Sequence, residues 1–391
     1  MDRYLVTFDR SVKERSSMAS TLGRPRQGIV DGVQHLAAEA QGLASDVILA
    51  FPFISVASLV LEEDEAAALR QRGEIYGVRR TRKVQGSPIS RDFASPMAVP
   101  GAPPWHIPLI NAEKSWSRTT GRGVRVGIID SEIDRDIADL PIVEGQTFHP
   151  ETTEWWGTDD PHGTFCAAIV GCRTGNTGMV GVAPDCDLYA MRTNKGGTGS
   201  EESLIAAMAW AVEKKLHVVS LSQWDFAGAD EPHEAPWEEL GRAAEELTKA
   251  GCIVIGISGN SGNRPKPWVT NPGRCPAIVA VGATNADQTW WQSSSYGPDD
   301  LPEERAVELV APGNSVLSLL PGGYAAPGSG TSFAAPQIAG ACALVKQLRP
   351  DLTPSQIRSV LKTTSRDFGP LGRDSKFGVG FLDCFAAISS L

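Results

Sequence analysis

The sequence predicts an α/β protein in which helices cover both faces of a parallel sheet, preceded by a small α+β domain. Two observations predict the sheet: apolar runs after residue 123 lack the alternation of half-exposed strands, and helical segments separate them. Strands that are apolar on both faces and joined by helices form parallel sheets buried between helical layers. A third observation divides the chain, because residues 85–105 are rich in proline, serine and glycine and show no periodicity, as in a linker.

The small domain is predicted from the strand and helix signals of the first eighty residues. Residues 4–8 and 47–61 are rich in strand-forming side chains, and Pro52 divides the second run into two strands. Residues 62–73 begin with acidic side chains and end with glycine, as a short helix does, and 74–80 have the composition of a strand. We therefore place a domain at 1–83, a linker at 84–105 and a second domain at 106–391.

The second domain alternates strands with helices. Helices are predicted at 165–172, 201–215 and 237–251. Near-continuous apolar strands are predicted at 124–130, 187–192, 217–222, 252–258 and 277–283. Ligands of such sheets bind beyond the carboxyl ends of the strands, so functional residues are expected there.

Composition excludes several classes of function. A hydrophobic content of 41% and 21% charged residues describe an ordinary globular protein. The net charge of −10 argues against nucleic acid or an anionic membrane as the main partner. The seven cysteines are scattered without metal spacing, which predicts buried free thiols. No basic start precedes an apolar segment, so we expect no secretory signal and a cytoplasmic protein.

The stretch "GSGTSFAAP" at 328–336 places Ser332 just before a helical segment. Serine is a common helix cap, and this role alone would explain it. Alternatively, Ser332 is a nucleophile at the positive end of the helix, beside backbone N–H groups that bind a developing oxyanion. The choice depends on whether a base and an orienting acid occur elsewhere.

Three residues at strand ends or helix starts supply those parts. Asp130 ends a strand, His162 opens a helix and Asn260 follows a strand. Taken singly, each has an ordinary explanation as a loop aspartate, a capping histidine or a turn asparagine. Together with Ser332 they provide a nucleophile, a base near pKa 7, a carboxylate that orients the base, and an oxyanion donor.

These motifs resemble those of the subtilisin-like serine proteases, the subtilase superfamily. "VGIIDSEID" is similar to the aspartate motif, "HGTFCAA" to the histidine motif, "GISGN" to the oxyanion motif and "GTSFAAP" to the serine motif. The likeness covers about residues 105–391, and residues 1–83 resemble an inhibitory propeptide. It implies a serine endopeptidase that forms an acyl-enzyme, with Asp130, His162 and Ser332 as the triad and Asn260 in the oxyanion hole.

The resemblance also implies two edges that bind a peptide substrate as an added strand. Trp224 stands where subtilases commonly have glycine, so it would narrow the groove. Residues 78–86 are placed to occupy the groove as a product-like strand, with Arg79, Arg80, Arg82 and Lys83 meeting an acidic cleft near Glu132. A solvated basic linker is the alternative for these side chains. The implied substrate-binding residues are Gly197, Thr198, Gly199, Ser222, Gln223, Trp224, Ser258 and Gly259.

The sequence departs from the family pattern at several positions. Glu132 adds a charge near the triad, and Phe165 and Gln337 each replace a common histidine. No cofactor is expected to be required. A calcium site at Asp139 and the loop 173–179 is implied, although Gly175 lacks the expected side-chain oxygen, and an ordinary turn is the alternative.

Peptides or proteins are the expected substrates, and the N-terminal domain is the expected inhibitor. A second hypothesis is a dedicated processing protease that acts on one precursor or partner. A third is a catalytically silent binding protein, whose signature would be the loss of Asp130, His162 or Ser332. All three are present.

Overall fold

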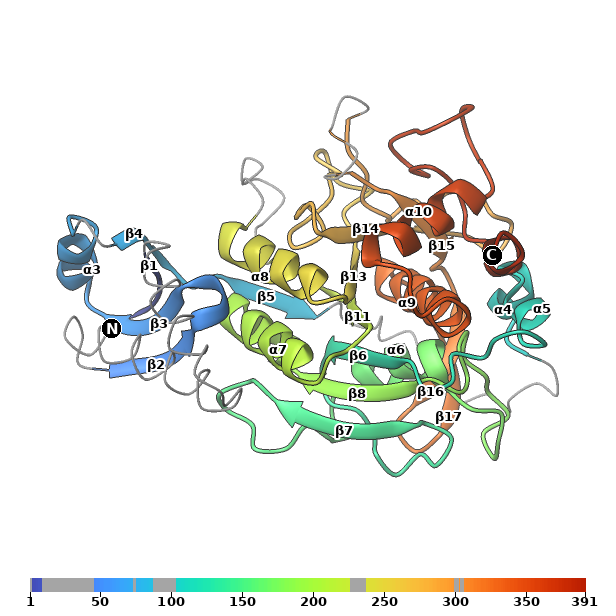
Figure 1. Ribbon diagram of the computed structural model, residues 1–391, viewed down its shortest axis with the longest axis horizontal. Helices are drawn as coiled ribbons and strands as arrows, with labels where there is room; N and C mark the ends of the chain where they lie inside the picture. Colours follow the sequence, from blue (N-terminus) through green and yellow to red (C-terminus); the bar gives the residue numbers. More distant parts are fainter. Residues whose placement is uncertain are drawn as a thin grey trace.

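A computed structural model describes residues 2–8, 46–72, 75–86, 103–225, 237–298, 302 and 306–391 (Figure 1). The large domain is built on a seven-stranded sheet of order β15-β14-β13-β11-β6-β8-β7, and every neighbouring pair is parallel. The predicted α/β class is therefore confirmed. The strands are β6 (Arg125–Asp130), β7 (Ile142–Thr147), β8 (Asp187–Arg192), β11 (Val218–Leu221), β13 (Ile253–Ile257), β14 (Ile278–Thr284) and β15 (Leu309–Pro312).

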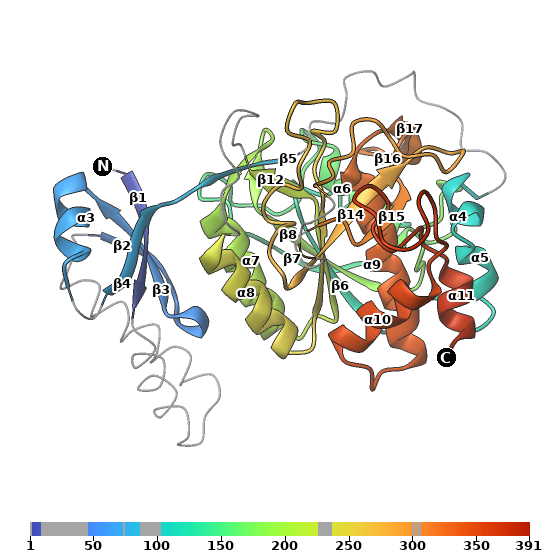
Figure 2. The ribbon, with the colours of Figure 1, turned by 90° about the horizontal axis from the view of Figure 1, so that it is seen from above.

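Helices cover both faces of this sheet (Figure 2). One face packs on α6 (His162–Gly171) and α9 (Thr331–Leu348), and the other on α7 (Glu201–Glu213) and α8 (Glu238–Lys249). Neighbouring residues of one strand therefore enter different cores. In β6, Ile128 faces α6 and α9, whereas Ile129 faces α7 and α8. This two-sided burial explains the near-continuous apolar composition of the central strands.

Shorter elements complete the large domain. Strands β16 (Val316–Leu320) and β17 (Tyr324–Gly328) form a hairpin that leads into α9. The remaining helices are α4 (His106–Leu109), α5 (Ala112–Ser115), α10 (Pro354–Thr364) and α11 (Cys384–Ser389). All seven cysteines are buried and unpaired, as predicted. Among the described residues, no helix is both long and apolar enough to cross a membrane.

The small domain is an antiparallel sheet of order β2-β3-β1-β4 with one helix. Pro52 opens a short 3-10 helix, η1 (Pro52–Ile54), which separates two strands as predicted. Helix α3 is held at its start by a capping box between Glu62 and Glu65. The other elements are β1 (Asp2–Phe8), β2 (Asp46–Phe51), β3 (Val56–Leu61), α3 (Glu63–Leu69) and β4 (Ile75–Arg80).

One face of the small sheet packs against the large domain. Leu5, Phe51, Ile54 and Val56 are buried in the same apolar cluster as residues of α7 and α8. Burying a side chain of this size contributes about 1.5–3 kcal/mol, so the four form a substantial interface. Beyond β4 the chain leaves the small sheet and enters the large domain as β5 (Lys83–Gly86) (Figure 2). Residues 87–102, most of the predicted linker, lie outside the described residues.

Candidate active site

Asp130 and His162 form the centre of the candidate site. Asp130 is the last residue of β6, at the carboxyl edge of the sheet, and His162 is the first residue of α6. Asp130 Oδ1 lies 2.6 Å from His162 Nδ1 and also accepts the Ser131 N–H at 2.7 Å. Both side chains are buried, and the short contact fixes the orientation of the ring and leaves Nε2 on its far side.

The environment of His162 favours its protonated form. Burial, the largest single influence, would lower its pKa, but the interactions with Asp130 and Cys166 together outweigh burial and raise the pKa well above the ordinary value of 6.5. The same carboxylate would stabilise an imidazolium formed during a reaction. In its neutral form His162 is therefore a strengthened base that can take a proton from a neighbouring hydroxyl group.

Ser332 lies in the first turn of α9, close to this pair. The ring of the next residue, Phe333, is 5.6 Å from the His162 ring, measured between centroids. Ser332 Oγ and His162 Nε2 are both buried, and neither has a hydrogen bond within the described residues. Catalytic hydrogen bonds are often long in the absence of substrate. Both atoms are therefore free to form the hydrogen bond between Ser332 and His162 that catalysis requires.

Asn260 lies beside the start of α9. Its Oδ1 accepts two hydrogen bonds from Thr331, one from the backbone N–H and one from the hydroxyl, both at 2.9 Å. Because a backbone N–H can only donate, this contact fixes which end of the Asn260 amide is oxygen. The Nδ2 end lies on the side of Gly330, where an added Cβ would be 3.5 Å away. The Nδ2 group of Asn260 and the backbone N–H groups in the first turn of α9, which have no partner within the helix, thus lie close together.

Cys166 is a site residue that the sequence analysis missed. It lies one turn after His162 on α6, with Sγ 3.8 Å from His162 Nδ1 and 3.4 Å from the Ser332 carbonyl oxygen. Burial raises the pKa of its thiol to about 11, so it is a thiol at neutral pH. The four-residue spacing from His162 was the available signal, because such residues share one helix face.

Two short strands correspond to the edges of the substrate groove that the resemblance implies. Strand β10 (Thr198–Ser200) pairs with β9 (Asn194–Lys195), and β12 (Gln223–Asp225) follows β11. Strand β5 lies between them and pairs antiparallel with both, giving a sheet of order β12-β5-β10-β9. In this register Val84 is opposite Gly199, and Gln85 is opposite Trp224.

Close packing against β5 explains the glycine at position 199. A Cβ on Gly199 would lie 3.0 Å from Val84 Cγ2 and 2.6 Å from the Thr193 carbonyl oxygen. Gly197, with φ +76°, adopts the left-handed conformation that glycine favours in the turn before β10. These small residues let another backbone approach the edge.

The other residues predicted to bind substrate make hydrogen bonds within the large domain. Ser222 Oγ donates to the Ser332 carbonyl oxygen at 3.1 Å. The side chain of Gln223 is buried and donates to Thr193 Oγ1 at 2.6 Å. It therefore stabilises β12 from the buried side. Ser258 and Gly259 follow β13, and their carbonyl oxygens accept backbone N–H groups from Thr270 and Ser295.

The expectation that Arg79, Arg80, Arg82 and Lys83 meet an acidic cleft near Glu132 is wrong for Arg79 and Arg80, whose carboxylate partners lie elsewhere. Glu132 is buried, with Oε2 2.5 Å from Arg192 Nη2 and Oε1 accepting the N–H groups of Asp159 and Asp160 at 3.0 Å. Its charge is therefore already compensated inside the large domain. Arg79 instead contacts two other buried carboxylates, Glu201 and Glu239.

The residues around Asp139 do not fit a calcium ion as they are arranged. Asp139 Oδ2 accepts the N–H and the hydroxyl of Thr177, each at 2.7 Å, and Oδ1 accepts the Asn176 N–H at 3.2 Å. A Cβ on Gly175 would lie 2.0 Å from Asp139 Oδ1, so that position admits no side-chain ligand. Calcium requires several oxygen ligands, whereas donor groups surround this carboxylate. The triad chemistry itself requires no cofactor.

Comparisons find similar known proteins over most of the chain. The subtilase family pattern matches residues 121–380. Alkaline elastase YaB of Bacillus sp. (strain YaB) is 30% identical over 389 residues, 99% of this chain and 91% of that protein. Subtilisin Savinase of Lederbergia lenta is 34% identical over 289 residues, 73% of this chain and 98% of that protein. The crystal structure of MycP1 from Mycobacterium smegmatis is similar with a TM-score of 0.66 at 25% identity, over 78% of this chain and 89% of that chain.

Proposed function

Because the chain belongs to the subtilase family of serine endopeptidases, we propose that it cleaves peptide bonds with Asp130, His162 and Ser332 as its catalytic triad. We further propose that it is made as an autoinhibited precursor, in which β5 fills the substrate groove. The placement of β5 between β10 and β12, the two implied substrate-binding edges, is the observation that carries this proposal.

In the proposed reaction, Ser332 Oγ attacks the substrate carbonyl carbon while its proton passes to His162 Nε2. Asp130 holds the ring through Nδ1 and stabilises the imidazolium. The oxyanion that forms accepts hydrogen bonds from the Asn260 amide and from a backbone N–H in the first turn of α9. His162 then gives its proton to the leaving amine, and water attacks the acyl-enzyme in a second, equivalent cycle.

Groove occupation by β5 supports the autoinhibited state. A peptide that binds by strand addition needs the free backbone groups of β10 and β12, and β5 already uses them. Val84 is fully buried at this position, so a competing substrate would have to displace its side chain as well.

Contacts between the domains support the same state. Arg79 donates to both oxygens of Glu201, at 2.6 and 2.8 Å, and also to Glu239. Both carboxylates lie in the first turns of their helices, α7 and α8, and both are buried. Removing the small domain would take away the cation that compensates them.

Trp224 is the observation that favours a narrower function, the processing of one partner. This large side chain lies on the groove edge opposite Gln85, at a position where β12 meets the bound strand. It would restrict which peptides enter. Cytoplasmic location remains a prediction from the sequence.

Labelling with a serine-directed fluorophosphonate tests the catalytic assignment. We expect the label on Ser332, and neither labelling nor peptide hydrolysis in Ser332→Ala. The loss in kcat should be about 10⁴-fold or more, because the members of a triad act as a unit. Labelling that persists in Ser332→Ala would contradict the assignment.

A further inference from the structure

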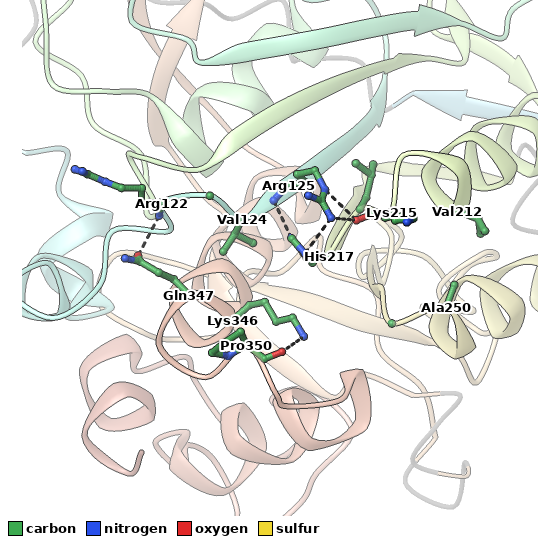
Figure 3. A pocket seen from close by; sticks show the side chains of 13 residues that line it. Arg122, Val124, Arg125, Val212, Lys215, His217, Ala250, Lys346, Gln347 and Pro350 are labelled. Carbon is green, nitrogen blue, oxygen red and sulfur yellow. Dashed lines mark hydrogen bonds between the residues drawn. The ribbon is translucent and has the colours of Figure 1, made fainter.

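A hollow lies at the edge of the main sheet opposite to the candidate active site, and Figure 3 shows the side chains that line it. It is formed at the amino ends of β6 and β11, together with the end of α9, and has a volume of about 600 Å³. Arg125 borders the hollow and Asp130 the active site, at opposite ends of β6, so about 17 Å of strand separates them. The volume is in the range of small-molecule sites.

The lining of this hollow is basic although the whole chain is acidic. No carboxylate is among the described residues that line it. Arg122 is paired with Asp185 at 3.1 Å, and Lys346 has Asp351 nearby. Within the described part of the chain, neither Arg125 nor Lys215 has an ion pair. We call it the basic hollow, defined by the basic residues that line it: Arg122, Arg125, Lys215, His217 and Lys346.

Two hydrogen-bond donors in the basic hollow face each other without a shared acceptor. His217 Nδ1 must act as an acceptor, because the backbone N–H of Arg125 donates to it at 3.0 Å. Burial, Arg125 and Lys346 lower the pKa of His217 to about 4, so the ring is neutral near pH 7 and has its hydrogen on Nε2. His217 Nε2 lies 3.3 Å from Arg125 Nη2, and Nη2 can only donate as well (Figure 3). An oxygen atom that accepts from both would resolve the conflict.

Lys215 is held in an unfavourable conformation at the same place. It follows α7 with φ +53°, the left-handed region that glycine adopts readily and that is unfavourable for residues with a Cβ. Its carbonyl oxygen accepts hydrogen bonds from Nε and Nη2 of Arg125, at 3.0 and 2.7 Å. These two bonds fix the Arg125 guanidinium group at the edge of the basic hollow. Its ammonium group has no hydrogen bond to other described residues.

We propose that the basic hollow binds a small, multiply charged oxyanion of the phosphate type. One oxygen would accept from His217 Nε2 and Arg125 Nη2, and Lys215 and Lys346 would compensate the remaining charge. Arginine and lysine together are typical ligands of phosphate groups. No aromatic side chain other than His217 lines the hollow among the described residues, so a stacked nucleobase is not part of the proposal. The proposal does not depend on the catalytic assignment.

Isothermal titration with inorganic pyrophosphate tests this proposal on the full-length chain carrying Ser332→Ala, which prevents self-digestion. We expect saturable binding of one pyrophosphate, a rise in Tm that follows the same curve, and weaker binding of inorganic phosphate. Sodium chloride at matched ionic strength should not reproduce the effect. Citrate, which has comparable charge but different geometry, should bind more weakly than pyrophosphate.

The variant Lys215→Gly distinguishes a loss of pyrophosphate binding from a loss of folding stability. Glycine suits φ +53°, so Tm without ligand should stay equal or rise, whereas pyrophosphate affinity should fall about tenfold or more. Lys114→Gln, which removes one positive charge outside the lining, should leave affinity within about twofold. Absence of saturable binding, unchanged affinity in Lys215→Gly, or tighter binding of citrate would each overturn the proposal.

Discussion

Arg79 of the small domain and Glu201 of the large domain form a two-pronged ion pair, with nitrogen–oxygen distances of 2.6 and 2.8 Å. Arg79 ends in the interface because β4 leads directly into β5, which lies in the groove. The pair therefore couples the position of the small sheet to the position of the blocking strand.

The first prediction concerns this pair. Arg79→Ala in a fragment of residues 1–86 should weaken inhibition of the processed enzyme at least about thirtyfold. Truncating one partner of a buried, hydrogen-bonded charge pair costs about 2–5 kcal/mol, and here two carboxylates would lose their cation. The measurement is the inhibition constant of the fragment.

Arg80→Ala is the matched control. Arg80 is more exposed and contacts only residues of its own domain among those described, namely Asp2, Tyr4 and Glu63. Its removal should change the inhibition constant by less than about fivefold. Equal losses in both variants would refute a specific role for Arg79.

The second prediction concerns the oxyanion donor. Asn260→Ala should lower kcat about 10²–10³-fold with little change in KM, because the amide acts mainly on charge that develops in the transition state. Asn260 also holds Thr331 at the start of α9, so Thr331→Ala, which loses only the hydroxyl contact, is the control. If Thr331→Ala lost as much kcat as Asn260→Ala, the effect would be structural.

The third prediction is a pH profile. His162 must be neutral to accept the Ser332 proton, and Asp130 raises its pKa well above 6.5 against the effect of burial. Activity should therefore be present above this raised pKa and be lost as the pH falls through it, about tenfold per pH unit. The measurement is kcat/KM of the processed enzyme against pH. A midpoint at or below 6.5 would show that the carboxylate does not dominate.

The fourth prediction concerns calcium. Asp139 accepts three hydrogen bonds from Asn176 and Thr177, so a chelator should leave Tm and kcat/KM unchanged. Gly175→Ala should destabilise the loop, because its Cβ would lie 2.0 Å from Asp139 Oδ1. A rise in Tm on adding calcium, lost in Asp139→Asn, would mean that the loop rearranges around an ion.

Local patterns predicted five of the seven strands of the main sheet, all but β7 and β15, and indicated four candidate site residues. The central strands are buried on both faces, so their apolar composition is visible in the sequence. Strand β7 was not predicted, because it lies at the sheet edge, is half-exposed and contains Glu144, Gly145 and Gln146. Its pairing with β8 depends on tertiary context rather than on composition.

Charge partners were not predictable in the same way. Arg79 was expected near an acidic cleft and Glu132 was noted as an added charge, but each is compensated by a residue distant in sequence. Spacing along a chain indicates which residues share a helix face or a strand end, whereas the partner of a buried charge depends on how domains pack. The donor conflict between His217 and Arg125 likewise appears only when β6 and β11 lie side by side.

Intact mass spectrometry of the purified chain tests the central claim most directly, namely that β5 is a product-like strand placed before Ser332. We predict that the wild-type chain shortens to a species that begins after Gly86 and before about residue 105, whereas Ser332→Ala keeps its full length. Processing that depends on Ser332 would link the nucleophile to the strand in its groove. A wild-type chain that stays uncut and yet is fully active, or a Ser332→Ala chain that is cut at the same place, would contradict the account.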